Sequence, residues 1–139
     1  MSDFLLSQLL VAVVLCFDVA SFQFRDKRHV LACLVFSASL MGAHFWLIGA
    51  DTAAALGFIA AVRFFCAIFT SARWLLFIFL GVVLTNAVVS FAGLITVFAT
   101  VGALITTTAS FLASDQRFRQ GMIVGTLVWI AHNVLVGSP

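Results

Sequence analysis

The chain has 139 residues, of which 64% are hydrophobic and 9% are charged, and its formal net charge is +2. A soluble globule of this length needs more polar surface than this composition supplies. The composition therefore excludes an ordinary water-soluble domain and predicts a protein covered by lipid. The basic residues lie in short clusters between apolar runs, so the positive charge indicates membrane topology and not nucleic-acid binding.

Apolar runs of roughly twenty residues follow one another along the chain, and each is long enough to cross the hydrocarbon core of a bilayer. They predict an all-α membrane protein with six transmembrane helices in a bundle. The stretch from Trp74 to Leu112 has about twice the length of one crossing, so it must turn. The turn is predicted in residues 86–93, which contain Ser90 and Gly93. The predicted spans cover about residues 4–20, 30–49, 52–70, 74–89, 94–112 and 121–137.

Residues 20–49 return in weaker form as residues 109–137, which indicates an internal duplication. The offset between the copies is 89 residues in the first half and 88 in the second, so one single-residue gap keeps both halves in register. Each copy is a helix end, a short charged turn and a long apolar helix with one histidine. The matching pairs are Ser21 and Ser110, Phe22 and Phe111, Asp26 and Asp115, Arg28 and Arg117, His44 and His132, and Gly49 and Gly137.

The duplication predicts how one polytopic membrane domain, residues 1–139, is divided. Spans one and two match spans five and six and start on the same side, so the copies are parallel, and span four reverses the direction between them. Residues 1–70 are the first repeat, residues 71–92 an inverting linker helix, and residues 93–139 a second, incomplete repeat. The counterpart of span three, a seventh helix, is missing: either the polypeptide ends one helix short, or the sequence is truncated.

Six of the seven basic residues sort to one face of the predicted bundle. Under the positive-inside rule this face, with loops 23–29 and 113–119, is cytoplasmic, and the N-terminus and Pro139 lie in the periplasm. The N-terminal segment has no basic leader, so we interpret it as a retained helix and not as a signal peptide. The sorted residues are Arg25, Lys27, Arg28, Arg73, Arg117 and Arg119 on the basic face, against Asp3 and Asp51 on the other.

Several of these motifs resemble the YgjV-type bacterial inner-membrane proteins. The residues that carry the resemblance are Ser21-Phe22-Gln23 before a basic turn, Ala43-His44-Phe45 with Gly49, Arg63 in span three, and Ala131-His132-Asn133 with Gly137. The resemblance covers nearly the whole chain. It implies a polytopic protein of the bacterial inner membrane, and the family carries no established activity.

More remotely, the repeat plan and the Ser-Phe-Gln helix end are similar to the SWEET and PQ-loop transporters. Those families imply a substrate path between two three-helix repeats that opens alternately to each side. The sequence departs from them because its only proline is Pro139, so the paired prolines that hinge SWEET-type helices are absent. Phe22 stands where the PQ-loop proline would be.

Polar side chains inside the predicted spans are the candidates for function, because a polar or ionisable group at membrane depth is costly. His44 and His132 occupy matching depths in the two copies and are predicted to face a common cavity, where neutral imidazoles bind a small polar solute or relay protons. The alternative is that each imidazole bonds a neighbouring helix. Asn133, Asn86 and Gln8 are predicted to line the same cavity, with a structural role as the alternative.

Asp18 and Arg63 form a predicted intramembrane ion pair that holds span one against span three. The alternative for Arg63 is a side chain that snorkels to the membrane surface. Thr106, Thr107 and Thr108 are expected to bond to carbonyls of their own helix. The cysteines, Cys16, Cys33 and Cys66, have no metal-ligand spacing and are interpreted as small packing residues.

Two functions follow from this pattern. The first is a small-solute transporter with its path between the two repeats, and the second is a non-transporting membrane scaffold or partner-binding subunit. An enzyme is not expected, because the sequence has no glutamate, no H-E-x-x-H and no phosphate-binding loop. The expected partners are the lipid bilayer, a small polar solute and further copies of the chain, with no cofactor, no metal and no nucleic acid.

Overall fold

The computed structural model describes residues 3–137, and these residues form six α-helices, which confirms the predicted all-α class. The predicted positions of the two chain ends, including Pro139, lie outside the described residues. The helices are α1 (Asp3–Gln23), α2 (Lys27–Leu47), α3 (Asp51–Phe69), α4 (Arg73–Val89), α5 (Leu94–Ser110) and α6 (Asp115–Val136).

The charged turns are shorter than the sequence predicts, because most of their charged residues belong to helices: Lys27 and Arg28 to α2, and Asp115, Arg117 and Arg119 to α6. Asp26 caps α2 and its carboxylate accepts a hydrogen bond from the Arg28 backbone N–H at 2.9 Å. Ser114 caps α6 in the same way and accepts from the Arg117 backbone N–H at 3.5 Å. The loops are therefore residues 24–26 and 111–114, not 23–29 and 113–119.

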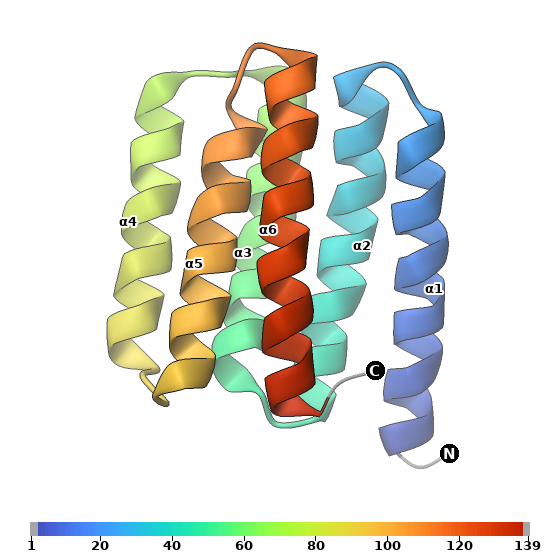
Figure 1. The fold of residues 1–139 in the computed structure, drawn as a ribbon, viewed down its shortest axis with the longest axis vertical. Coiled ribbons are helices and arrows are strands. Elements are labelled where there is room, and N and C mark those ends of the chain that lie inside the picture. Colours follow the sequence, from blue (N-terminus) through green and yellow to red (C-terminus); the bar gives the residue numbers. More distant parts are fainter. Residues whose placement is uncertain (1–2, 138–139) are drawn as a thin grey trace. The chain divides into compact units, whose positions relative to one another are not determined.

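The chain divides into two compact units, Met1–Phe69 and Thr70–Pro139. In the first unit α2 packs against both α1 and α3, and in the second unit α5 packs against both α4 and α6. Within each unit the three successive helices run antiparallel (Figure 1). The predicted linker helix, residues 71–92, corresponds to α4, which belongs to the second unit.

Glycines bring α2 and α3 into direct backbone contact. A Cβ atom added to Gly57 would lie 2.7 Å from the Gly42 Cα and 2.9 Å from the Gly42 nitrogen. Ala53, Gly57 and Ala61 repeat at intervals of four along α3 and are all buried. Small residues at this spacing let two helix backbones approach closely, which is the usual basis of helix association in lipid.

Small residues also bring α5 and α6 into close contact. Gly121 and Gly125 lie one turn apart on α6, and both face small side chains of α5. A Cβ atom on Gly121 would lie 2.6 Å from the Ala109 Cβ, and one on Gly125 would overlap the Thr106 methyl group. The glycines of α6 are therefore required by the packing of the second unit.

The outward faces of the helices are apolar. The helices α2 and α3 have the length and hydropathy to cross a membrane, and α4, α5 and residues 8–23 of α1 form shorter apolar helices. Water does not tolerate so much exposed apolar surface, whereas hydrocarbon does. An example from each helix is Val19, Phe36, Phe65, Phe77, Val97 and Leu127, all exposed.

The contact between Gly42 and Gly57 predicts the effect of a single methyl group. Replacing Gly57 with Ala forces α2 and α3 apart, and we expect a loss of about 1–3 kcal/mol in the free energy of unfolding, the usual cost of overpacking. Thermal unfolding of the purified protein in detergent measures this loss.

Gly81 in α4 is the matched control, because a Cβ atom there meets nothing within 4 Å. We expect Gly81→Ala to leave the melting temperature unchanged or to raise it, since alanine favours helix more than glycine does. Equal melting temperatures for Gly57→Ala and the wild type would contradict the proposed contact.

Candidate functional site

The two histidines of the repeat are both fully buried, at 0% exposure. The ring of His44 on α2 lies 5.3 Å from the ring of Phe45. The ring of His132 on α6 lies edge-on to Trp129 with the ring centroids 5.1 Å apart, and its Nδ1 lies 3.4 Å from Asn133 Oδ1. Each unit thus places one enclosed imidazole inside an apolar helix, and a cavity shared by the two rings stays a prediction.

The three predicted amides, Gln8, Asn86 and Asn133, are half-buried. Asn133 is the one that lies beside a predicted histidine, because it follows His132 directly. The main-chain carbonyl of Asn86 accepts hydrogen bonds from the Ser90 backbone N–H at 3.0 Å and from the Ser90 hydroxyl at 2.6 Å. These bonds terminate α4 through the backbone carbonyl of Asn86 and do not involve its side-chain amide.

Asp18 is joined to α2 by a short hydrogen bond. The Ser37 hydroxyl donates to Asp18 Oδ1 at 2.6 Å, and the Ser21 hydroxyl donates to the Asp18 main-chain carbonyl, also at 2.6 Å. Within residues 3–137, Asp18 and Arg63 form no ion pair. The partner of Asp18 is therefore a neutral hydroxyl on the adjacent helix, and the carboxylate links α1 to α2 where the sequence suggested a link to α3.

Arg63 lies inside α3 and is almost completely enclosed, at 1% exposure. Its guanidinium carbon lies 4.3 Å from the ring centroid of Phe64, which is cation–π distance. Such burial is unlike a snorkelling arginine, whose head group reaches water. A guanidinium buried inside an apolar helix is a functional candidate by itself.

A row of buried hydroxyls along α5 is a feature that the sequence analysis did not select. Thr106 and Thr107 donate to the carbonyls of Gly102 and Ala103 at 3.0 and 2.6 Å, so the expected bonds to their own helix are confirmed. The spacing of four between Thr96 and Thr100 and between Thr106 and Ser110 was the signal available in the sequence. The buried members of the row are Thr96, Thr100, Thr106, Thr107 and Ser110.

Thr100 differs from the other members of this row. Its side chain is 8% exposed, and its hydroxyl has no hydrogen-bond partner in the described part of the chain. A hydroxyl in a helix normally bonds to the carbonyl four residues earlier, and an unsatisfied buried group costs about 1–3 kcal/mol. Thr100 therefore offers a donor and an acceptor to a polar molecule.

The cysteines are free thiols, with Cys16 exposed on α1 and with Cys33 and Cys66 half-buried. Among the described residues, His, Cys and acidic side chains form no cluster of three or more that would hold a metal ion.

Six helices with apolar outer faces and polar groups buried within them define an α-helical membrane protein. The chain belongs to the Imp-YgjV family of bacterial inner membrane proteins, whose family model matches residues 5–139. It is 26% identical over 140 residues to the inner membrane protein YgjV of Escherichia coli (strain K12), and the alignment covers 99% of this chain and 75% of that protein. No solved structure matches the chain. The resemblance to the YgjV-type inner-membrane proteins noted in the sequence is thereby confirmed.

The hydrogen bond between Ser37 and Asp18 predicts a specific loss of stability. Ser37→Ala removes the hydroxyl that supports the carboxylate, and we expect the free energy of unfolding to fall by about 1–2 kcal/mol. Asp18→Asn keeps an acceptor for Ser37 and should be tolerated better than Asp18→Ala. Thermal unfolding in detergent compares the variants.

Ser39 on the same helix is the control, because its hydroxyl bonds to the Val35 carbonyl within α2. We expect Ser39→Ala to have little effect, since no other helix loses a contact. If Ser39→Ala lowers the free energy of unfolding as much as Ser37→Ala does, the hydrogen bond between α1 and α2 contributes no more stability than a bond within one helix.

Proposed function

We propose that the protein is a transporter of a small polar solute in the bacterial inner membrane, with its path between the two copies of the repeat. The observation that carries this proposal is the complete burial of His44 and His132 inside apolar helices. Polar groups are rare at membrane depth and typically mark a solute path or a proton relay. Two imidazoles at matching sequence positions are harder to explain as separate structural bonds than one imidazole is.

The local structure of the two copies supports the duplication. Ser21 and Ser110 are both buried near the ends of α1 and α5, and each hydroxyl bonds to a carbonyl of the preceding turn. Gly49 and Gly137 both follow a long helix with positive φ, +77° and +67°, a conformation that favours glycine. The second helix of each copy begins with a side-chain cap, Asp26 for α2 and Ser114 for α6, although Ser114 lies one residue before Asp115, the match of Asp26 in the repeat.

The hydroxyl of Thr100 is a further buried polar group of the kind that a solute path requires. Like the histidines, Thr100 is buried in an apolar helix, and its bonding capacity is not used within the part of the chain that the structure describes. We include Thr100 with His44, His132 and Asn133 in the proposed solute-binding set.

We also propose that all six helices cross the membrane and that the loops with the basic residues face the cytoplasm. These residues lie at the N-terminal ends of α2, α4 and α6, where the helix dipole favours anions over cations. Helix stability therefore does not explain their positions, whereas the positive-inside rule does. The residues concerned are Lys27, Arg28, Arg73, Arg117 and Arg119.

The proposed topology predicts which of two exposed alanines is reached from the periplasm. Ala92 lies in the loop before α5 and Ala113 in the loop after it. In a variant without native cysteines, we expect a membrane-impermeant maleimide to label Ala92→Cys in cells with a permeabilised outer membrane. Ala113→Cys should be labelled only after the inner membrane is broken. The reverse pattern would invert the orientation, and labelling of both sites in unbroken cells would exclude a crossing by α5.

The proposed path predicts that the two histidine positions lie near each other and are accessible to water. In the same background, with a protease site inserted at Ser71, we expect His44→Cys and His132→Cys to be joined by a bifunctional thiol reagent of about 10 Å reach. After cleavage at the protease site, the joined protein still runs as one full-length band on a denaturing gel. If the reagent contains a disulfide, a reductant then separates the two halves. We expect each single cysteine to react with a small water-soluble thiosulfonate.

Two controls make this test specific. Ile130 lies two residues before His132 and is exposed, so Ile130→Cys should not be joined to His44→Cys. Val14 is buried at 2% exposure among apolar residues, so Val14→Cys should not react with the thiosulfonate. If neither histidine position reacts, water does not reach these positions. The proposal of a transporter is then replaced by the scaffold or partner-binding function.

A further inference from the structure

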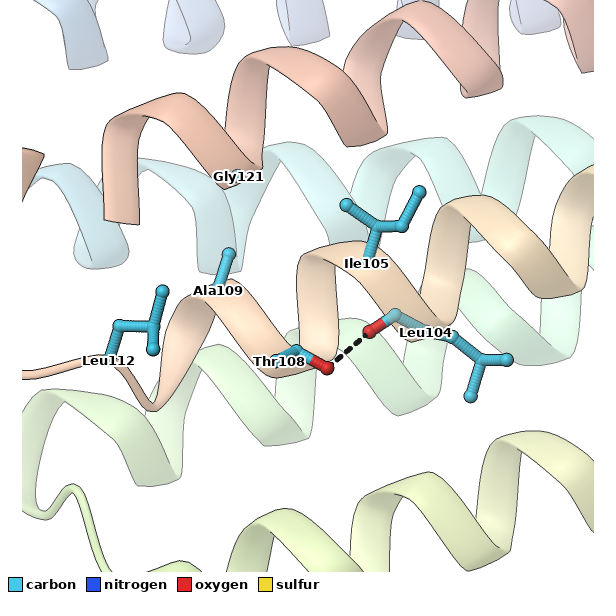
Figure 2. Close-up of a pocket in the computed structure, with 6 residues that line it drawn as sticks. All are labelled: Leu104, Ile105, Thr108, Ala109, Leu112 and Gly121. Atoms are coloured by element: carbon cyan, nitrogen blue, oxygen red, sulfur yellow. Dashed lines mark hydrogen bonds between the residues drawn. The ribbon is translucent and has the colours of Figure 1, made fainter. Parts of the chain in front are cut away.

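A groove of about 350 Å³ lies between α5 and α6 of the second unit. Thr108 is the one polar side chain among the residues that line it, and its hydroxyl is already used, because it donates to the Leu104 carbonyl at 2.9 Å (Figure 2). The groove therefore suits hydrocarbon and not a polar solute. Its lining residues are Leu104, Ile105, Thr108, Ala109, Leu112 and Gly121.

The shape of the groove follows from the same small residues that pack the two helices. In Figure 2, Ile105 and Ala109 point from α5 toward α6, where the absence of a side chain at Gly121 lets the Ala109 methyl group approach the helix closely. Leu104 and Thr108 lie one turn apart on α5, and Leu112 follows two residues after the end of that helix; these residues form one wall. The helical part of the wall, from Leu104 to Thr108, is about 6 Å long at 1.5 Å per residue.

One end of the groove lies in positively charged surroundings. Arg117 is exposed and precedes Gly121 by one helical turn, so both residues lie on the same face of α6. Arg73 begins α4 at the same end of the unit, as shown by the stacked rings of Phe79 on α4 and Phe111 at the end of α5, 6.1 Å apart. Residues 70–139 contain three arginines and one acidic residue, Asp115.

We propose that this groove binds an anionic phospholipid. One acyl chain lies against the wall formed by Leu104, Thr108 and Leu112, and the lipid phosphate is held by Arg117. A guanidinium binds phosphate oxygens through paired charge-assisted hydrogen bonds, which fixes the head group at the charged end of the groove. The inference rests on the membership of the chain in a membrane-protein family and is independent of transport.

The test uses the full chain, purified and delipidated in a neutral detergent. Dioleoyl phosphatidylglycerol is titrated against dioleoyl phosphatidylcholine, and the melting temperature is followed by tryptophan fluorescence. We expect the anionic lipid to raise the melting temperature at concentrations where the zwitterionic lipid has no effect. Arg117→Gln should raise the half-saturating concentration about tenfold, the effect of losing one charge-assisted contact.

Thr108→Trp fills the groove and should abolish the response to the lipid. Thr85→Trp is its matched control, because Thr85 is an exposed threonine of α4 whose hydroxyl likewise bonds to the carbonyl four residues earlier. For Arg117→Gln the control is Arg28→Gln, an exposed arginine in the first turn of α2. The controls should respond as the wild type does.

The proposal is overturned by equal shifts with both lipids, by an unchanged response in Thr108→Trp, or by an equal shift with glycerol phosphate alone, which has the head-group charge but no acyl chain. If Thr108→Trp melts lower than the wild type before any lipid is added, Arg117→Gln decides the question. An unchanged half-saturating concentration in that variant also overturns the proposal.

Discussion

The fold of each unit depends on close contact between helix backbones. In lipid the hydrophobic effect does not drive one apolar helix against another, so association depends on packing and on hydrogen bonds between helices. The contacts of Gly57 with Gly42 and of Gly121 with Ala109 supply this packing, because in both places an added Cβ atom would lie closer than side chains tolerate. The hydrogen bond from Ser37 to Asp18 supplies the polar link between α1 and α2.

The sequence predicted the number and order of the helices because a bilayer sets the length of each apolar run. It misplaced the start of α6, since Asp115–Arg119 has the composition of a turn but follows a capping residue, Ser114, that starts a helix. It also paired Asp18 with Arg63, because both were predicted to lie inside spans near the same membrane face. Which side chains meet depends on the rotation of each helix about its axis, and α1 packs against α2, where Ser37 supplies the partner.

The buried polar groups fall into three kinds, and the distinction decides which of them suggest function. Thr106, Thr107 and Ser110 are satisfied by carbonyls of their own helix, so their burial has a local explanation. Asp18 is satisfied across a helix pair and has a structural explanation. His44, His132 and Thr100 form the third kind: the two imidazoles are fully buried ionisable groups, and the Thr100 hydroxyl has no hydrogen-bond partner among the described residues. The proposed solute path is built on them and not on the longer row of hydroxyls.

The proposed duplication also accounts for a difference between the two units. With the offset of 89 residues that holds in the first half of the repeat, Asp18 on α1 corresponds to Thr107 on α5. The Asp18 carboxylate accepts a hydrogen bond from Ser37 on the neighbouring helix, whereas the Thr107 hydroxyl donates to the Ala103 carbonyl of its own helix. Under the proposed duplication, a side chain that links two helices in one copy is replaced by one that is satisfied within a single helix in the other. The carboxylate therefore occurs in one copy only, so any path built between the proposed copies would have unlike electrostatic surroundings on its two sides.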